Sequence, residues 1–472
     1  MSVDGWKNAT IESLIADGVI ITHKDGNHGS NYPRASEFGK RGVPFITAKL
    51  LDDSGNIDIE NAPRLNNNKA SKFTFGFIQA DDVLLSHNAT VGRVAVVPML
   101  NERVLIGTSL TLYRLDITRL LPKYLAAYFS GREFQNQLAS VMSQTTRNQV
   151  PITSQRKLSI VIPPLNEQEK VADILESFDK KIELNRQTNQ TLEQIAQAIF
   201  KSWFVDFEPV KAKMAAKQAG ATAEQIEQAA ICTISGKTPE QLAQLDPQTL
   251  KQLKTTAALF PDALVDSELG EMPEGWEAKP LGNYLEIKRG GSPRPINEYM
   301  VEKGLPWTKI ADATAEPSPF LFRTKEFIKE EGLKKTVLLK KGTLILTNSA
   351  TPGLPKFLEL DACIHDGWLH FPNKKLFTDN YLYQLFLDIR KALIAQGNGS
   401  VFTNLKTDIL RNQVVVVPPQ DLIIKFEDTI QLIFMQLKEN CKEINVLTEL
   451  RDSLLPKLLS GEITLANQDE AS

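Results

Sequence analysis

The sequence predicts an α+β protein with two mixed α/β globular units, each followed by one long helix. Two observations support this prediction. The 472-residue chain repeats itself once, and each copy changes from short apolar runs to a heptad pattern after a Pro-Pro pair, at 163–164 and 418–419. Hydrophobic residues make up 42% and charged residues 24%, as in ordinary globular chains. No apolar run approaches the ~18 residues of a membrane span, so we expect none.

The repeat is visible as short matching segments at a nearly constant offset. Val43-Pro44-Phe45 matches Leu305-Pro306-Trp307 at an offset of 262 (306 − 44). Residues 83–92 match 344–353 at 261 (344 − 83), and the Pro-Pro pairs match at 255 (418 − 163). An offset that drifts so little over most of each copy indicates an internal duplication with small loop insertions and deletions.

The two globular units are expected at 1–162 and 273–419. Short apolar runs such as 94–97 and 414–417 lie between clusters of Gly, Asn, Ser and Pro, a pattern typical of mixed α/β structure with many loops. Residues 1–160 and 273–419 each carry a net charge of +4, and the remainder carries −11. A polyanion would therefore be attracted to the globular units and not to the helices.

The two long helices are expected at 163–207 and at the start of the segment 420–472, which ends in a C-terminal tail. Heptad spacing places an apolar seam on each. The seam residues are Val171, Ile174, Phe178, Leu192 and Ile199, extended by Ile182, Ile195 and Trp203, and then Phe426, Ile433, Leu437, Leu447 and Leu454, extended by Ile423, Ile430 and Ile444. Asn185 and Asn440 hold the same mid-seam place, 255 apart (440 − 185), where a buried Asn pair could fix register. The simplest solution packs one helix on the other; two core helices in separate domains are the alternative.

The segment 208–272 is rich in Ala and Gln, and we interpret it as an inserted helical linker without chemistry. Catalytic and metal motifs are incomplete throughout: Cys363, His365 and His370 lack a second ligand pair at zinc-like spacing, so no metal site is expected. One loose match leaves an enzyme open, a single-chain nuclease using Asp262, Glu277 and Lys279. A coiled-coil scaffold with no nucleic-acid role is a further alternative. Three widely spaced cysteines favour a reducing compartment and hence a cytoplasmic protein.

The polar loops of both units carry side-chain types that contact base edges and phosphates. The residues predicted to contact DNA in the first unit are Lys24, His28, Ser30, Tyr32, Arg34, Lys40, Arg41, His87, Asn88, Gln144, Thr146, Arg147 and Asn148. Those in the second unit are Lys288, Arg289, Ser292, Arg294, Asn348, Ser349, Ser400, Thr403, Asn404 and Lys406. Arg147 has only uncharged neighbours of base-reading types, which favours guanine readout over a phosphate contact. Solvated polar loops are the alternative for any single residue.

Five stretches resemble one family, the specificity subunits of type I restriction-modification systems. The most specific begins Ile162-Pro-Pro-Leu-Asn-Glu-Gln and runs to Leu175; the others are Asp179-Lys-Lys-Ile-Glu-Leu, Ile199-Phe-Lys-Ser-Trp-Phe-Val-Asp-Phe-Glu-Pro, Ser267-Glu-Leu-Gly-Glu-Met-Pro-Glu-Gly-Trp and Leu454-Leu-Pro-Lys-Leu-Leu-Ser-Gly-Glu-Ile. The resemblance covers almost the whole chain. It departs from the family pattern where the second helix starts Pro-Pro-Gln-Asp-Leu and in the length of the linker.

The resemblance implies two target-recognition domains, each reading half of a bipartite DNA site that is asymmetric because the units differ. It implies that the two conserved spacer helices pair as an antiparallel coiled coil, which places the duplicated units around a pseudo-twofold axis. It also implies two docked adenine methyltransferase (modification) subunits that bind S-adenosylmethionine. Restriction subunits using ATP and Mg would join through them. The chain itself would be non-catalytic, would bind no cofactor and would have double-stranded DNA as its ligand.

Overall fold

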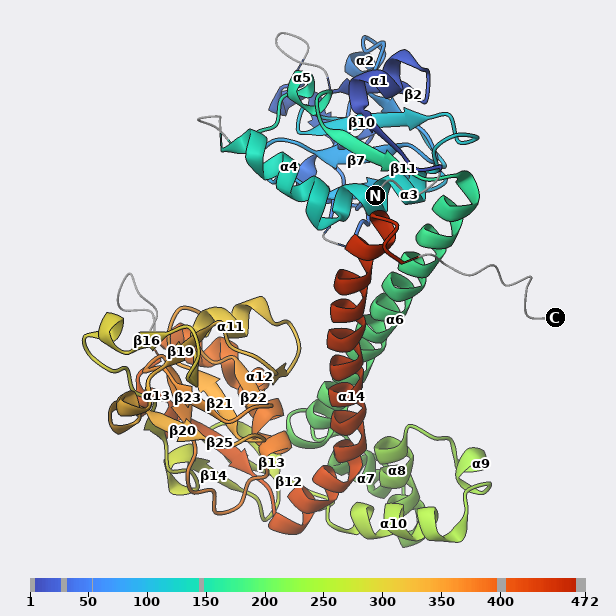
Figure 1. Cartoon of the computed structure of the whole chain (residues 1–472). Helices are drawn as coiled ribbons and strands as arrows, with labels where there is room; N and C mark the ends of the chain where they lie inside the picture. Colours follow the sequence, from blue (N-terminus) through green and yellow to red (C-terminus); the bar gives the residue numbers. More distant parts are fainter. Residues whose placement is uncertain (1–4, 27–31, 53, 144–147, 397–404, 464–472) are drawn as a thin grey trace, which may run out of the picture. The chain divides into compact units, whose positions relative to one another are not determined.

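The computed structural model describes residues 5–26, 32–52, 54–143, 148–396 and 405–463 (Figure 1). The chain divides into two compact units, residues 1–184 with 443–472, and residues 185–442. The division passes through the two long helices, α6 (Leu165–Phe204) and α14 (Gln420–Leu459). Each compact unit therefore combines one globular part with a segment of both helices.

The globular part of the first compact unit is closed by a two-strand clasp, in which β1 (Lys7–Thr10) pairs antiparallel with β11 (Ser159–Ile162). A four-stranded sheet has the order β2-β10-β7-β8, with bounds Ile20–Asp25, Leu110–Leu115, Val83–Ser86 and Val94–Val96. A five-stranded sheet has the order β3-β5-β4-β9-β6, with bounds Phe38–Gly39, Arg64–Leu65, Val43–Ile46, Val104–Ile106 and Phe77–Ile78. The helices are α1 (Ile11–Ala16), α2 (Asn67–Ala70), α3 (Pro122–Ser130), α4 (Arg132–Met142) and α5 (Ile152–Gln155).

The globular part of the second compact unit has the same plan. Its clasp pairs β14 (Glu277–Pro280) with β25 (Val414–Val417). One sheet has the order β15-β24-β21-β22-β18, with bounds Lys288–Arg289, Trp368–His370, Leu344–Thr347, Pro355–Leu358 and Phe320–Leu321. The other has the order β16-β19-β17-β23-β20, with bounds Met300–Val301, Glu326–Ile328, Leu305–Thr308, Ala362–Ile364 and Val337–Leu339. The helices are α11 (Ile310–Ala315), α12 (Asp379–Gln396) and α13 (Thr407–Asn412).

The duplication extends to individual backbone angles. The parallel pair β4–β9 in the first unit corresponds to the parallel pair β17–β23 in the second. Ala89 and Ala350, 261 apart (350 − 89), both adopt left-handed backbone angles, with φ of 65° and 58°. Alanine rarely adopts such an angle, so its recurrence at the matching place confirms the internal duplication predicted from the sequence.

The two long helices, each of 40 residues, run antiparallel within each compact unit. In the first unit, Lys181 Nζ lies 3.3 Å from Glu443 Oε2, and Arg451 Nη1 donates to Asp179 Oδ1 at 2.7 Å. In the second unit, Asn440 Nδ2 donates to Asn189 Oδ1 at 2.9 Å, and the ring centroids of Phe200 and Phe426 are 5.7 Å apart. In both units the α14 number rises as the α6 number falls. The predicted antiparallel pairing is confirmed.

The heptad residues lie along this contact, with two corrections. Val171, Asn185, Phe426, Leu437 and Asn440 are buried, whereas Ile174, Phe178, Leu192, Ile199, Ile433, Leu447 and Leu454 are half-buried. Ile195 is 43% exposed, and its neighbour Ala196 is fully buried in its place. The heptad seam was predicted from large apolar residues only, so the small side chain of Ala196 was not recognised as the buried one.

The Asn pair is the second correction. Asn440 bonds Asn189 and not Asn185, although Asn185 holds the matching place in the repeat. Residue numbers increase in opposite directions along two antiparallel helices. Residues at equivalent positions of the two repeats therefore need not lie opposite each other. Asn189 Nδ2 also donates to Cys441 Sγ at 3.2 Å, so both side-chain groups of Asn189 have partners on α14.

The inserted segment has its own small core. Helices α7 (Glu208–Gln218), α8 (Ala223–Ser235), α9 (Pro239–Leu242) and α10 (Pro247–Ala258) bury Ala230, Ile231, Leu242 and Ala257. The segment, predicted as a helical linker, does not end in a helix. There β12 (Leu264–Ser267) and β13 (Gly270–Pro273) form a hairpin, because Gly270 takes a left-handed φ of 97° at the turn. Among the described residues, no helix is long and apolar enough to span a membrane.

Candidate nucleic-acid interface

Several predicted contact residues of the first unit lie exposed around its five-stranded sheet. Lys40 and Arg41 lie between β3 and β4, and Arg34 lies just before β3; all three are exposed. Tyr32 is 43% exposed, with its ring edge-on to Phe45 of β4 at 6.2 Å. Lys24 extends from β2, and its Nζ lies 5.3 Å from the ring centroid of Phe75. These cations and this aromatic ring suit phosphate contact and base stacking.

Other predicted residues lie outside the described part of the chain, and their roles remain predictions. They are His28, Ser30, Gln144, Thr146, Arg147, Ser400, Thr403 and Asn404. Asn148, which directly follows residues 144–147, is exposed, and Lys406 is exposed at the start of α13. Ser349 and Asn88 are half-buried, and Asn88 bridges to Gln149.

His87, predicted to contact DNA, is buried. It is 6% exposed, and Thr111 Oγ1 lies 2.8 Å from its Nδ1. Its carbonyl accepts from Val150 N at 2.8 Å, while Ala89 N donates to Asn148 O at 3.2 Å. These bonds attach residues 148–150 to the turn after β7. His87 therefore holds residues 148–150, which directly follow the segment that contains Arg147.

Gln155 completes this anchor and was not singled out from the sequence. Its side chain is fully buried: Nε2 donates to Thr111 Oγ1 at 2.9 Å and to Val150 O at 3.0 Å. Its Oε1 accepts from Tyr113 OH at 2.6 Å and lies 3.4 Å from His23 Nε2. The hydrogen-bond partners of Gln155 come together only in the folded chain, so the sequence alone does not mark it as a buried residue.

The burial of His23 predicts a pH-dependent stability. Loss of solvation lowers the pKa of His23 from 6.5 to about 4, and the bond to Gln155 opposes this only in part. Below pH 6.5, His23 binds a proton in the unfolded chain, whereas in the folded chain it binds one only near pH 4. Stability is therefore complete above pH 6.5 and falls as the pH drops towards 4.

When the pH falls from 7 to 5, the free energy of unfolding of the parent protein should drop by about 2 kcal/mol through His23, at ~1.4 kcal/mol per pH unit below 6.5. We expect His23→Gln to lack this part of the drop. Urea unfolding of both proteins at the two pH values measures the difference. The same loss in both would show that His23 is not the group responsible.

In the second unit, four predicted residues converge on one that was not predicted, Asp366, in the turn between β23 and β24. Arg289 donates from Nε and Nη2 to Asp366 O, at 3.3 and 2.9 Å. Ser292 Oγ donates to Asp366 Oδ1 at 2.8 Å, and Arg294 Nη2 lies 3.9 Å from Oδ2. Asn348 Nδ2 donates to Asp366 O at 3.2 Å. Asp366 was not predicted because the sequence argument selected cationic, amide and hydroxyl side chains as DNA contacts, and Asp366 is a carboxylate.

Asn348, also predicted to contact DNA, is 2% exposed, so the surrounding protein covers its side chain. Its place in the repeat matches His87 (348 − 87 = 261), and its role is similar. Asn348 O accepts from Leu405 N at 2.6 Å, as His87 O accepts from Val150 N. In both units the carbonyl oxygen of this buried residue accepts from a backbone N–H that lies shortly after residues outside the described ranges.

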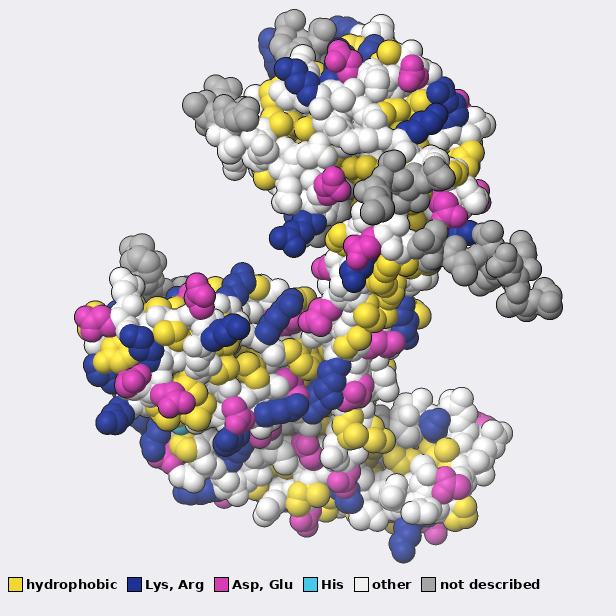
Figure 2. Space-filling view, in the orientation of Figure 1, with side chains coloured by type: hydrophobic (Ala, Val, Ile, Leu, Met, Phe, Trp, Pro, Cys, Tyr) yellow, Lys and Arg dark blue, Asp and Glu magenta, His cyan; other side chains and the backbone are white. Residues whose placement is uncertain are grey.

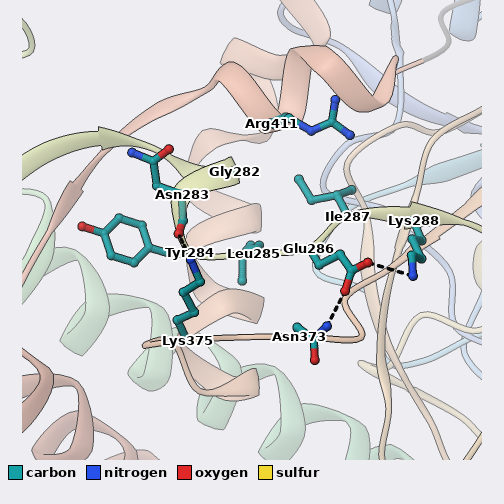
Figure 3. Close-up of a pocket in the computed structure, with 10 residues that line it drawn as sticks. All are labelled: Gly282, Asn283, Tyr284, Leu285, Glu286, Ile287, Lys288, Asn373, Lys375 and Arg411. Atoms are coloured by element: carbon teal, nitrogen blue, oxygen red, sulfur yellow. Dashed lines mark hydrogen bonds and ion pairs between the residues drawn. The ribbon is translucent and has the colours of Figure 1, made fainter.

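Lys288 belongs to a different surface from its neighbour Arg289. Successive strand residues point to opposite faces, and Lys288 faces a pocket of about 520 Å³ formed by residues 282–288 with Asn373, Lys375 and Arg411 (Figure 3). Lys288 Nζ lies 2.7 Å from Glu286 Oε1, and Lys375 Nζ donates to Asn283 O at 3.1 Å. Arg411 pairs with Asp408. Because these cations have partners inside the protein, the pocket is not the strongest candidate for DNA contact.

The nuclease alternative finds no support in the geometry. Asp262 Oδ2 lies 2.8 Å from Lys217 Nζ, and Glu277 Oε2 accepts from Tyr284 OH at 3.1 Å. Each carboxylate is thus bonded to a different neighbour. Across the described ranges, no group of three His, Cys, Asp or Glu side chains could hold a metal ion.

Comparison with known proteins assigns the class. The family model described as "Type I restriction modification DNA specificity domain" matches twice, at residues 36–194 and 273–445. The chain thus carries two copies of a DNA specificity domain. It belongs to the family of type I restriction-modification specificity subunits. The matches leave out 195–272, which contains the inserted helices.

Two named specificity subunits agree with this assignment. The chain is 32% identical to the type I restriction enzyme HindI specificity subunit of Haemophilus influenzae over 414 residues, 82% of this chain and 87% of the relative. It is 25% identical to the MjaIX specificity subunit of Methanocaldococcus jannaschii over 452 residues, 91% and 89% of the two chains. The crystal structure of a type I restriction-modification S subunit from M. genitalium aligns over 96% of both chains, with 16% identity and a TM-score of 0.49.

Proposed function

We propose that this chain reads a bipartite, asymmetric DNA site, each globular unit reading one half across a fixed gap. One observation carries the proposal: the globular unit is duplicated, with matching strand orders except that β18 adds a fifth strand to one sheet of the second copy, but the loop residues differ. The buried anchor is His87 in one copy and Asn348 in the other, and Asp366 with its arginines belongs to the second copy alone. Two similar units with different contact residues would read two different half-sites.

The net charge of each globular part supports DNA as the ligand. Both carry +4, and Figure 2 shows Lys and Arg side chains spread over the visible face of the second globular part. Cations on such a face neutralise phosphates and contribute affinity without sequence preference. Polar side chains such as those around Asp366 would add the preference.

We also propose that the long helices bind two modification subunits and, through them, restriction subunits. Hydrophobic side chains are exposed along the visible face of α14 (Figure 2). Leu432, Met435 and Ile424 are 71%, 52% and 44% exposed, and at ~100° per residue they fall within about 80° of one another around α14. An apolar group of this kind on a helix is typical of a protein contact.

Replacing Leu432 and Met435 together by Glu is expected to weaken the complex with the modification subunits at least tenfold. Each side chain, if fully buried in the complex, contributes about 1.5–3 kcal/mol. Titration calorimetry of the full chain with modification subunits measures the change. Met99→Glu is the matched control, because Met99 is 85% exposed in a loop of the first globular part. Equal affinity of the double variant and the parent protein would contradict docking on this face.

In this proposal the chain is non-catalytic and binds no cofactor of its own. S-adenosylmethionine belongs to the modification subunits, ATP and Mg belong to the restriction subunits, and the complex works in the cytoplasm. The same complex would carry adenine methyltransferase and ATP-dependent endonuclease activities.

Labelled duplex DNA, with and without magnesium, tests the proposal against its alternatives. The chain with its modification subunits should bind with sequence preference, and the isolated chain should leave DNA uncut. Cleavage by the isolated chain that is lost in Asp262→Asn would establish the nuclease instead. Failure of the complex to bind any DNA would favour the scaffold.

A further inference from the structure

The Asp366 carboxylate is held firmly at one oxygen and loosely at the other. Its side chain is 40% exposed. Oδ1 accepts from Ser292 Oγ at 2.8 Å and lies 2.9 Å from His365 Nε2. Oδ2 faces the guanidinium of Arg294 at 3.9 Å, beyond hydrogen-bond distance, and the Arg294 side chain is 73% exposed.

The hydrogen bonds of His365 show which of its ring nitrogens donates to Asp366 Oδ1. Gly367 N donates to His365 Nδ1 at 2.8 Å, so Nδ1 is the acceptor and Nε2 carries the proton in the neutral ring. Nε2 therefore donates to Asp366 Oδ1. Burial lowers the pKa of His365, with Asp366 opposing this shift, which favours the neutral ring. With two donors on Oδ1, the orientation of the carboxylate is fixed and Oδ2 is directed towards Arg294.

The backbone beneath the carboxylate is fixed as well. Arg289 and Asn348 both donate to Asp366 O, and Asn348 N donates to Gly367 O at 2.7 Å. Because Arg289 uses Nε and Nη2 in these bonds, it is committed to the turn. Among the described residues, the guanidinium of Arg294 has only its long contact with Oδ2. Arg294 is thus the arginine of this cluster that can extend towards a ligand.

A guanidinium beside a fixed carboxylate is well suited to read guanine. It has five N–H donors in a planar fork, so one edge can bond a carboxylate while the other donates to O6 and N7 of guanine. A carboxylate that bonds the guanidinium as the ligand binds would hold the fork in one orientation and lower the entropy lost on binding. A lone carboxylate on a DNA-facing surface would repel phosphates, whereas one paired with arginine does not.

We propose that Arg294 reads a guanine in the second half-site and that Asp366, held by Ser292 and His365, is its positioning residue. This inference rests on the proposed function, because it assumes that the second unit reads DNA. It adds which base is read, by which side chain, and which carboxylate orients that side chain.

The test uses the full chain in complex with its modification subunits and a randomised duplex DNA library, from which bound sequences are selected and sequenced. The parent complex should select a guanine at one position of the second half-site. Arg294→Ala should reduce that preference about 5- to 150-fold and leave other positions unchanged. Asp366→Ala should reduce the preference at the same position by a smaller factor, and Asp366→Asn should retain part of it.

Asp361→Asn is the matched control. Asp361 is also an exposed carboxylate paired with a cation, since its Oδ2 lies 2.7 Å from Lys340 Nζ and its side chain is 48% exposed. It precedes β23, whereas Asp366 follows that strand. We expect no change in base preference in this variant.

Three results separate the possibilities. Equal weakening by Arg294→Ala on all sequences, with a smaller dependence on salt, would mean a phosphate contact and overturn the inference. A shift at a different position, or at none, in Asp366→Ala would overturn the positioning role. A parent complex with no preference in the second half-site would instead contradict the proposed function. If Asp366→Ala does not fold, Ser292→Ala removes one donor from Oδ1 and should also reduce the guanine preference.

Discussion

Exchanging the two globular units while both long helices stay in place is expected to reverse the order of the two half-sites in the DNA motif. The units are residues 1–162 and 273–419. Each is closed on itself directly before its helix by the β1–β11 or β14–β25 clasp, with Lys7 opposite Ile162 and Glu277 opposite Val417. Each can therefore be moved as one piece with its loop anchors intact.

Mapping of methylated adenines in cells that express the exchanged chain with its modification subunits measures the outcome. The parent chain, expressed in the same way, is the control. An unchanged motif would contradict independent reading by the two units. Loss of all methylation with a folded, assembled complex would mean that each unit depends on the helix it normally precedes.

Lengthening both helices by four residues is expected to lengthen the gap between the half-sites by about one or two base pairs. At ~1.5 Å per residue, four residues add ~6 Å along each helix, and one base pair occupies ~3.4 Å. Insertion after Leu184 and after Lys442 falls at the division between the compact units. The contacts Arg451–Asp179 in one unit and Asn440–Asn189 in the other are then unchanged.

The methylated motif reports this outcome as well. Both half-sites should be retained, and only the number of bases between them should change. Insertion in α6 alone is the control, because it leaves α14 without matching length and should disturb the pairing. Altered half-sites at a constant gap would contradict the role of the helices as a spacer.

The fold could be predicted from the sequence where the signal is local and repeated. The offset between the copies and the heptads after each Pro-Pro pair required no knowledge of which segments meet in space, and both were confirmed. The exception, Ile195, shows the limit of such patterns: Ala196 occupies the buried position because close helix packing favours a small side chain there. The hairpin at 264–273 was missed because each strand has only four residues, too few for an alternating pattern to stand out.

The candidate site was less predictable because its chemistry depends on contacts between distant segments. His87 and Asn348 have base-reading side chains, but burial and bonds to Thr111 and to Asp366 O make them anchors. Asp366 lies 74 residues from Ser292, which donates to it. Gln155 likewise bonds Thr111 from 44 residues away. Residue type indicates what a side chain can bond, and only the fold determines which partner it finds.

The central claim is that one chain specifies two different half-sites at a fixed separation. Mapping every methylated adenine in a genome whose cells express this chain with its modification subunits tests it most directly, with cells lacking the chain as control. The account predicts one bipartite motif with two unlike halves and a constant gap, absent from the control. Methylation at a single continuous motif, or at two halves with a variable gap, would contradict it.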